Sequence, residues 1–259
     1  SANGKTIAVN GYDNSGERVY VYDVSSSTPL WQTSNNYDYY AYATNDVSQD
    51  GKYIVVKNER NVISFFSVTS STPLWRTSMY DCCSARFQEA VAISWDNKYV
   101  VAATGSLEYD KIITLNVTNG NVITYYTTEY TGAFDSISIA RDSKTFAAYH
   151  TTGRVFVFNM TENTPFQTIT TGTGSGNLDL SGNGKYLSVV TSSGSDLYLY
   201  DVENNVQLWS NQGNYHNYAM SGPQISINGK HIAVSGSSKT YLYNNSAAGS
   251  LSIYGYGSE

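Results

Sequence analysis

A short turn sequence that ends in lysine recurs along this chain and limits the folds available to it. The copies read SANGK, SQDGK, SWDNK, ARDSK, SGNGK and SINGK, and they end at Lys5, Lys52, Lys98, Lys144, Lys185 and Lys230. Successive lysines are therefore 47, 46, 46, 41 and 45 residues apart. A near-constant period of this length is typical of repeat architectures. The residue before each lysine is Gly, Asn or Ser, and Asp/Asn-Gly turns are strong hairpin signals.

Each repeat carries the same succession of short apolar runs around that turn. A run such as AVAIS or SISIA precedes the turn, and a run such as YIVV or YLSVV follows it. An alternating third run (RVYVYD, VISFFS, RVFVFN) and a fourth (PLWQT, PLWRT, QLWSN) complete the unit. Runs of this length, rich in β-branched and aromatic residues, predict strands. Four antiparallel strands per repeat predict an all-β, six-bladed β-propeller with blades starting near residues 1, 41, 89, 134, 176 and 222. We expect residues 1–259 to form this single domain.

The ends of the third strands and the Trp-bearing fourth strands carry a family resemblance. The third strands end in YD, FS, LN, FN, YD and YN, where WD repeats place their Trp-Asp pair. The PLW and QLW fourth strands resemble the repeats of quinoprotein propellers. The chain is thus similar to the WD-repeat and quinoprotein-like propeller superfamily at the level of the fold. Propellers host binding modules, enzymes and scaffolds, so function has to be argued from individual residues.

The first repeat is shorter than the others. Ser1 aligns with Ser48, Ser94, Ser181 and Ser226, which end the first strand of their repeats. The first blade therefore lacks its innermost strand within this chain. Three explanations are open: upstream residues carry the strand, the tail Ile253–Glu259 shifts inward, or another polypeptide adds the strand by β-augmentation. We expect the strand to come from outside residues 1–259, either from upstream residues or from a neighbouring subunit.

The charge and hydropathy of the chain indicate which classes of partner to expect. Charged residues make up 14% of the chain, and the formal net charge is −6. Nucleic acid is not expected, because phosphate binding needs a basic footprint. No apolar run approaches the ~18 residues that suggest a membrane-spanning helix. Tyr occurs 24 times, against 15 for Lys and Arg together. A surface of hydroxyl, amide and Tyr side chains suggests an extracellular or cell-surface protein.

Tyr residues gather in the loops that lead from one repeat to the next. These loops should share one face, and Tyr combines a large contact area with a polar tip. The candidate interaction face consists of Tyr37, Tyr39, Tyr80, Tyr130, Tyr215 and Tyr218. Packing of these rings on their own blades is the alternative. The partner expected at this face is protein, including copies of this chain, or glycan.

Two adjacent cysteines, Cys82 and Cys83, lie in one of these loops and are the only cysteines of the chain. The quinoprotein resemblance implies a vicinal disulfide, which in quinoprotein alcohol dehydrogenases caps the cofactor. A structural disulfide in an exported protein and free thiols in a cytosolic one are the other readings.

Catalytic, metal-binding and cofactor-binding residues are not expected. His150, His216 and His231 fall in different repeats without ligand spacing. No serine stands in a nucleophile-elbow context. Asp135 and Asp179 could meet across a central channel, but no motif surrounds them. The first strands offer small and hydroxyl residues such as Ala92, Ser136 and Ser181, which favours a scaffold.

Three sequons begin at Asn116, Asn159 and Asn244, each at the end of a third strand. Asp23, Ser67 and Asp201 hold the same position in the other repeats. Either glycans attach to these Asn side chains in an exported protein, or the turn simply requires a short polar residue.

The sequence therefore predicts a non-catalytic, exported propeller that serves as a structural or interaction module. Assembly with copies of itself into an extracellular filament, polymer or surface layer is one form of that function. The alternative is a ligand-binding or enzymatic propeller, quinoprotein-like or carbohydrate-active, that acts at the channel mouth.

Overall fold

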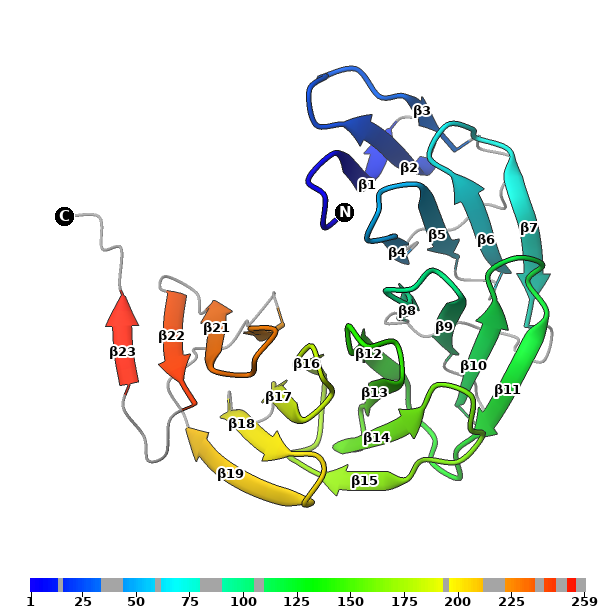
Figure 1. Cartoon of the computed structure of the whole chain (residues 1–259). Coiled ribbons are helices and arrows are strands. Elements are labelled where there is room, and N and C mark those ends of the chain that lie inside the picture. Colours follow the sequence, from blue (N-terminus) through cyan, green and yellow to red (C-terminus); the bar gives the residue numbers. More distant parts are fainter. Residues whose placement is uncertain are drawn as a thin grey trace. The chain divides into compact units, whose positions relative to one another are not determined.

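The structure, a computed structural model, contains six antiparallel β-sheets and no helix in the part of the chain that it describes (Figure 1). The described residues are 1–13, 16–33, 44–58, 62–79, 90–104, 110–192, 196–211, 222–235, 240–245 and 251–254. Each sheet is built from strands that follow one another in the chain. The all-β, six-bladed propeller type of fold predicted from the repeats is therefore confirmed.

Five sheets have four strands and the first has three. The first sheet is β1 (Thr6–Asp13), β2 (Gly16–Asp23) and β3 (Trp31–Gln32). The second is β4 (Thr44–Val47), β5 (Tyr53–Lys57), β6 (Val62–Ser67) and β7 (Pro73–Ser78). The third is β8 (Val91–Ile93), β9 (Tyr99–Thr104), β10 (Lys111–Asn116) and β11 (Val122–Thr127).

The remaining three sheets repeat this order. The fourth sheet is β12 (Phe134–Ile139), β13 (Thr145–His150), β14 (Arg154–Asn159) and β15 (Gln167–Thr170). The fifth is β16 (Gly176–Leu180), β17 (Tyr186–Thr191), β18 (Asp196–Asp201) and β19 (Val206–Asn211). The sixth is β20 (Gln224–Ile225), β21 (His231–Ser235), β22 (Thr240–Asn244) and β23 (Leu251–Tyr254).

Among the described residues, none forms in the first sheet the strand that opens every other sheet, as the alignment of the turns predicted. The Ser1 amino group donates to Thr6 O at 3.0 Å. In the second sheet the Ser48 N–H donates to Tyr53 O at 2.9 Å. Ser1 therefore occupies the position of Ser48, and β1 corresponds to β5, the second strand of its sheet.

The recurring turns depend on a left-handed residue before the lysine. Gly4, Gly51, Gly184 and Gly229 have φ between 68° and 71°. Asn97 and Ser143 adopt φ 56° at the same place. Asn often accepts this conformation, whereas Ser does so less readily. The turn geometry is thus kept in all six repeats although two of them lack glycine.

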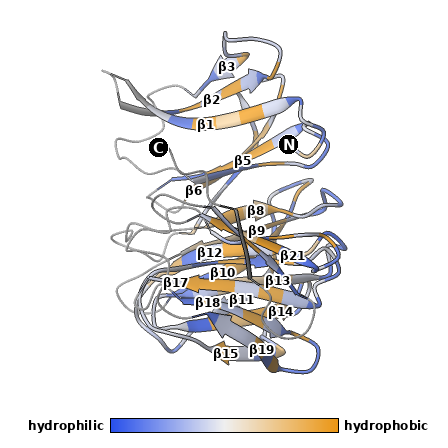
Figure 2. Ribbon diagram, turned by 90° about the vertical axis from the view of Figure 1, so that its left-hand side faces the viewer, coloured by the Kyte–Doolittle hydropathy of each residue, from blue (hydrophilic) through white to orange (hydrophobic). Residues whose placement is uncertain are grey.

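The apolar core lies between neighbouring sheets, and the chain divides into two compact units, Ser1–Phe134 and Asp135–Glu259. In the first unit, Val19 and Val21 pack with Ile54 and Val56. On the other face of β5, Val55 packs with residues of the third sheet. Both faces of this strand are buried, and its middle residues Ile54, Val55 and Val56 are apolar, which Figure 2 shows as hydrophobic colour on β5.

The second unit is packed in the same way. Val155 and Val157 of the fourth sheet contact Leu187 and Val189 of the fifth. The fifth and sixth sheets contact each other through one cluster of buried apolar side chains. Its members are Val190, Leu197, Leu199, Ile225, Ile232, Val234 and Tyr243. The fifth sheet thus packs against the fourth sheet and against the sixth sheet of its unit.

A β-bulge interrupts the outer edge of several sheets. The pairing of Phe65 with Trp75 is followed by that of Phe66 with Pro73, so Leu74 has no partner. Ile123 of β11 and Leu208 of β19 are bulged in the same way. A bulge bends the strand and disturbs its open edge. None of the described residues forms a helix that is long and apolar enough to span a membrane.

Candidate interaction site and the contacts between sheets

Most of the predicted Tyr face lies outside the described residues, as do both cysteines. This applies to Tyr37, Tyr39, Tyr80, Tyr215, Tyr218, Cys82 and Cys83. The remaining member, Tyr130, is half-buried, and its N–H donates to Thr128 Oγ1 at 2.7 Å. The proposed contact face and the vicinal disulfide therefore stay predictions.

The three sequon asparagines end the third strands β10, β14 and β22, as predicted. Asn159 and Asn244 are exposed, whereas Asn116 is half-buried and its Oδ1 accepts the Thr118 N–H at 2.8 Å. In the first sheet Asp23 Oδ1 likewise accepts the Ser25 N–H at 2.9 Å. These local turns explain the preference for a short hydrogen-bond acceptor at this position. The turn hydrogen bond uses Oδ1 of Asn116, so its Nδ2 takes no part in that bond.

A side chain six residues before the turn lysine joins one sheet to the next; we call this residue the staple position. Asp46 Oδ2 accepts the Ile93 N–H at 2.8 Å, from β4 to β8. Ser138 Oγ accepts the Leu180 N–H at 3.1 Å, from β12 to β16. Asp179 Oδ2 accepts the Ile225 N–H at 2.9 Å, from β16 to β20. The same backbone N–H of the next first strand is bound each time.

Asp179 connects three successive sheets. Its second oxygen, Oδ1, accepts the hydroxyl of Ser138 at 2.8 Å, while Oδ2 binds the sixth sheet. Burial raises the pKa of Asp179, although the hydrogen bonds from Ile225 and Ser138 oppose that rise. Burial also raises the pKa of Asp46 against two backbone hydrogen bonds. These carboxyl groups serve as acceptors for the backbone, a role that the sequence reasoning missed.

Asp135, near the start of β12, carries a half-buried carboxyl group that has a partner for only one of its two oxygens among the described residues. Its Oδ2 accepts the Gly176 N–H at 2.9 Å. Burial raises its pKa to about 6, and the hydrogen bonds from Gly176 and Ser175 and the charge of His150 oppose the rise. Asp135 Oδ1, Ser136 Oγ and Thr191 Oγ1 are buried and have no hydrogen-bond partner among the described residues. Asp135 and Asp179 thus bind different amides, and no shared site between them is formed.

A second set of contacts joins the outer strand of one sheet to a turn of the following sheet. We call the outer-strand residue that makes this contact the latch position. Trp31 Nε1 donates to Val68 O at 2.7 Å, and Trp75 Nε1 donates to Val117 O at 2.6 Å. In the second unit the Gln167 amide donates to the Asn205 side chain. Trp209 instead packs against Tyr243 of the sixth sheet, with 5.5 Å between ring centroids and the ring planes tilted by 30°.

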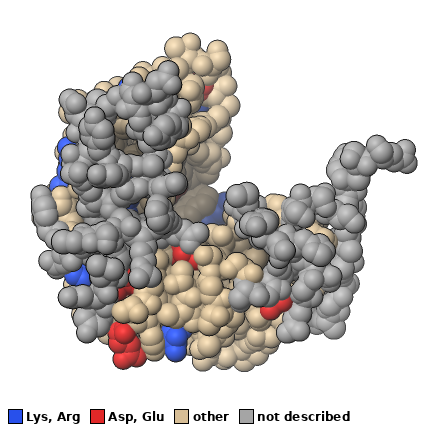
Figure 3. Space-filling view, turned by 180° about the vertical axis from the view of Figure 1, so that it is seen from behind, with Lys and Arg blue, Asp and Glu red and all other residues tan. Residues whose placement is uncertain are grey.

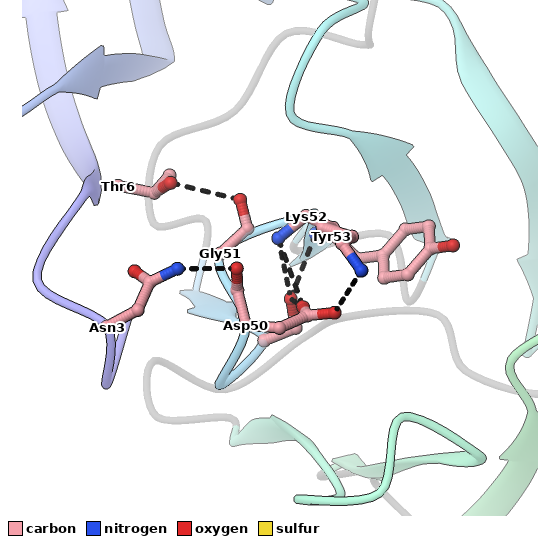
Figure 4. A network of polar contacts seen from close by, with 7 residues as sticks. Asn3, Thr6, Asp50, Gly51, Lys52 and Tyr53 are labelled. Atoms are coloured by element: carbon pink, nitrogen blue, oxygen red, sulfur yellow. Dashed lines mark hydrogen bonds and ion pairs between the residues drawn. The ribbon is translucent and has the colours of Figure 1, made fainter.

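The turns of neighbouring sheets are also hydrogen-bonded. Figure 4 shows Asn3 and Thr6 reaching the turn of the second sheet. The Asn3 Nδ2 donates to Asp50 O at 2.6 Å, and the Thr6 hydroxyl donates to Gly51 O at 3.0 Å. In the second unit the Gly182 N–H donates to Ile227 O at 2.8 Å. Sheets within a unit are therefore connected at their first strands, at their turns and at their outer strands.

Large apolar side chains project from the outer strands at one equivalent place, the bulge position just before the latch residue. The exposed fractions are 53% for Leu30, 58% for Leu74, 40% for Ile123, 51% for Phe166 and 42% for Leu208. We group Leu30 and Phe166 with the bulged residues because each directly precedes the latch residue of its sheet, Trp31 or Gln167, which is paired with the neighbouring strand. Single exposed apolar residues are common on proteins, but recurrence at an equivalent site of five sheets is not random scatter.

A scan against protein-family models gives no match, and a search of curated proteins gives none either. The resemblance to WD-repeat and quinoprotein propellers therefore stands on the repeat and the fold alone.

Proposed function

We propose that this chain is a non-catalytic, exported module that binds other proteins and assembles with copies of itself. The observation that carries this proposal is the recurrence of an exposed apolar side chain at the bulge position of five sheets. Burial of such a side chain in a contact contributes about 1.5–3 kcal/mol when it is complete. A protein partner that covers several of them would gain binding energy at each.

The sparse charge of the surface supports the same proposal. On the face drawn in Figure 3, Lys, Arg, Asp and Glu are few and scattered among the described residues. Contact surfaces between proteins are typically depleted of charge at their centres and contain aromatic residues. The outer strands β3, β7, β11, β15 and β19 contain one charged residue, Arg76.

Electron micrographs of the native material test this function directly. We expect filaments, sheets or other regular assemblies, because one bulge residue recurs in sheet after sheet. Only isolated particles at the native concentration would contradict the assembly part of the proposal.

Export predicts that the exposed sequons carry sugar. The intact mass of the natively produced protein should fall after enzymatic removal of N-glycans, with attachment mapped to Asn116, Asn159 or Asn244. An unchanged mass would mean that these residues serve only their turns.

The environment of Asp135 favours a second candidate, a ligand-binding or enzymatic propeller. Buried oxygens of Asp135, Ser136 and Thr191 without a hydrogen-bond partner among the described residues could accept or donate bonds to a small polar ligand. Calorimetric titration with soluble oligosaccharides and with a quinone cofactor would test it. Heat of binding that is lost in Asp135→Asn would support this candidate over the first.

A further inference from the structure

The outer strand of the third sheet, β11, is an edge suited to pair with another strand. The strand order of this sheet is β11-β10-β9-β8, so β11 ends the sheet among the described residues. β11 consists only of Val, Ile, Thr and Tyr, and its residues Val122 and Tyr125 are exposed. Uncharged segments of this length with high β-propensity and no proline readily pair with further strands.

The outer strands of the other sheets carry features that discourage such pairing. β3, β15 and β23 have only two to four residues. β7 begins with Pro73 and has Arg76 at the position that corresponds to Tyr125. β19 is as long as β11, but Gln, Ser and Asn make up half of it. Short length, proline and charge protect edge strands from unwanted partners, so β11 is the least protected outer strand that the structure describes.

The hydrogen bonds of the third sheet show which backbone groups of β11 face the open edge. The Thr128 N–H donates to Asp110 O at 2.9 Å, and these residues continue the register of the Lys111–Thr127 pair. Hydrogen-bonded and non-hydrogen-bonded pairs alternate in an antiparallel ladder. Thr127 and Tyr125 therefore form non-hydrogen-bonded pairs with β10. Their N–H and C=O groups point away from β10, towards the open edge.

We infer that β11 pairs in antiparallel orientation with β11 of a second copy of this chain. In this pairing Tyr125 exchanges two backbone hydrogen bonds with Thr127 of the second copy, and Thr127 does the same with Tyr125 of the second copy. A two-fold axis then passes beside Tyr126, and both copies use the same surface. Because β11 has no charged residue, the pairing avoids the repulsion that two nearby Arg76 side chains would cause in a pair of β7 strands.

This inference rests on the proposed function and states where two copies meet. A pairing of two strands of this length is at best marginally stable in water. The exposed side chains at the bulge position must therefore supply further contact. Ile123, the bulge residue of β11, directly precedes the regularly paired stretch. Loss of either the edge hydrogen bonds or the bulge-position contacts should weaken the association.

Tyr125→Pro tests the pairing, because it removes an N–H at the open edge without breaking a hydrogen bond to β10. Ser210→Pro, at the equivalent position of β19, is the matched control. In sedimentation equilibrium of residues 1–259, Y125P should raise the dissociation constant about tenfold or more, since each pair of copies loses two hydrogen bonds. S210P should match the wild type. If Y125P fails to fold, Tyr125→Lys keeps the N–H and weakens the pairing by like-charge repulsion instead.

Hydrogen exchange, measured at concentrations below and above the association, locates the contact. Peptides that cover Val122–Thr127 should gain protection on association, and those that cover Val206–Asn211 should not. Wild-type dissociation constants for Y125P and Y125K, or protection confined to other strands, would overturn the inference and leave the proposed function standing. Protection of Val122–Thr127 in native material without self-association would assign the edge to another protein and overturn the pairing of copies. A wild-type chain that never associates would contradict the proposed function and this inference with it.

Discussion

Replacing Asp135 by Asn should make the protein more stable near pH 7 and remove part of its pH dependence. Burial raises the pKa of Asp135 from 3.8 to about 6. A raised folded-state pKa means that the folded protein holds the proton more tightly than the unfolded chain does. The stability contributed by this group is therefore fully present below about pH 4 and is lost as the pH rises through about 6.

The size of the effect follows from that shift. A change of one pKa unit corresponds to about 1.4 kcal/mol, so a shift of about two units sets an upper limit of about 3 kcal/mol. Asp135 is partly accessible, and solvent screening lowers the expected value to about 1–2 kcal/mol. The Asn amide keeps an oxygen for the Gly176 N–H, now bound at 2.9 Å, and has no charge to desolvate.

The assay is urea unfolding at a series of pH values between 4 and 7.5. Trp209 is the one tryptophan in residues 135–259, so its fluorescence reports on the unit that contains Asp135. The stability of D135N minus that of the wild type should grow by about 1–2 kcal/mol from pH 4 to pH 7. Ser136→Ala keeps the carboxyl group and should retain the wild-type profile. A difference between D135N and wild type that is constant across the pH range would refute the reasoning.

Two further substitutions test the contacts between outer strands and turns. Trp75→Phe keeps an aromatic ring beside Phe65, on which Trp75 stacks with 5.1 Å between ring centroids, but it removes the donor to Val117 O. This variant should lower the free energy of unfolding by about 1 kcal/mol. An unchanged free energy of unfolding would mean that the latch hydrogen bond is not stabilising. Gly120→Ala should lower the free energy of unfolding by more than Gly4→Ala does. Both glycines have φ near +70°, but a Cβ at Gly120 would lie 2.6 Å from Trp75, whereas a Cβ at Gly4 would have no atom within 4 Å. The left-handed conformation costs both variants about 1–2 kcal/mol, and overpacking adds about 1–3 kcal/mol to the first alone. Equal urea midpoints for the two variants would argue against close packing of Trp75 on this turn.

The strands and turns could be predicted because their signals are local. The residue before each turn lysine takes a left-handed conformation in all six repeats, even where it is Asn97 or Ser143. The alignment of Ser1 with Ser48 also followed from the turn sequence, and the hydrogen bond of the Ser1 amino group to Thr6 O confirms it. In each case the interacting residues lie within a few positions of one another.

The staples could not be predicted because donor and acceptor belong to different repeats. Asp46 binds an amide 47 residues away, and Asp179 binds one 46 residues away. The same position holds Asp, Ser, Ala or Gln, so residue identity gave no repeating signal. Only a shared offset of six residues before the lysine connects them. The predicted Tyr face was argued from loops, and most of its residues lie outside the described part of the chain.

Sedimentation equilibrium of residues 1–259 over a wide concentration range tests the proposed assembly most directly. The chain mass is 28.4 kDa, and we expect the apparent mass to rise above it with concentration. The variant L30S/L74S/F166S/L208S, which changes exposed side chains at the bulge position, should remain at the mass of one chain. Val24→Ser, at a residue 58% exposed but outside the outer strands, is the control and should associate like the wild type. A wild-type protein that stays at 28.4 kDa throughout would contradict the account.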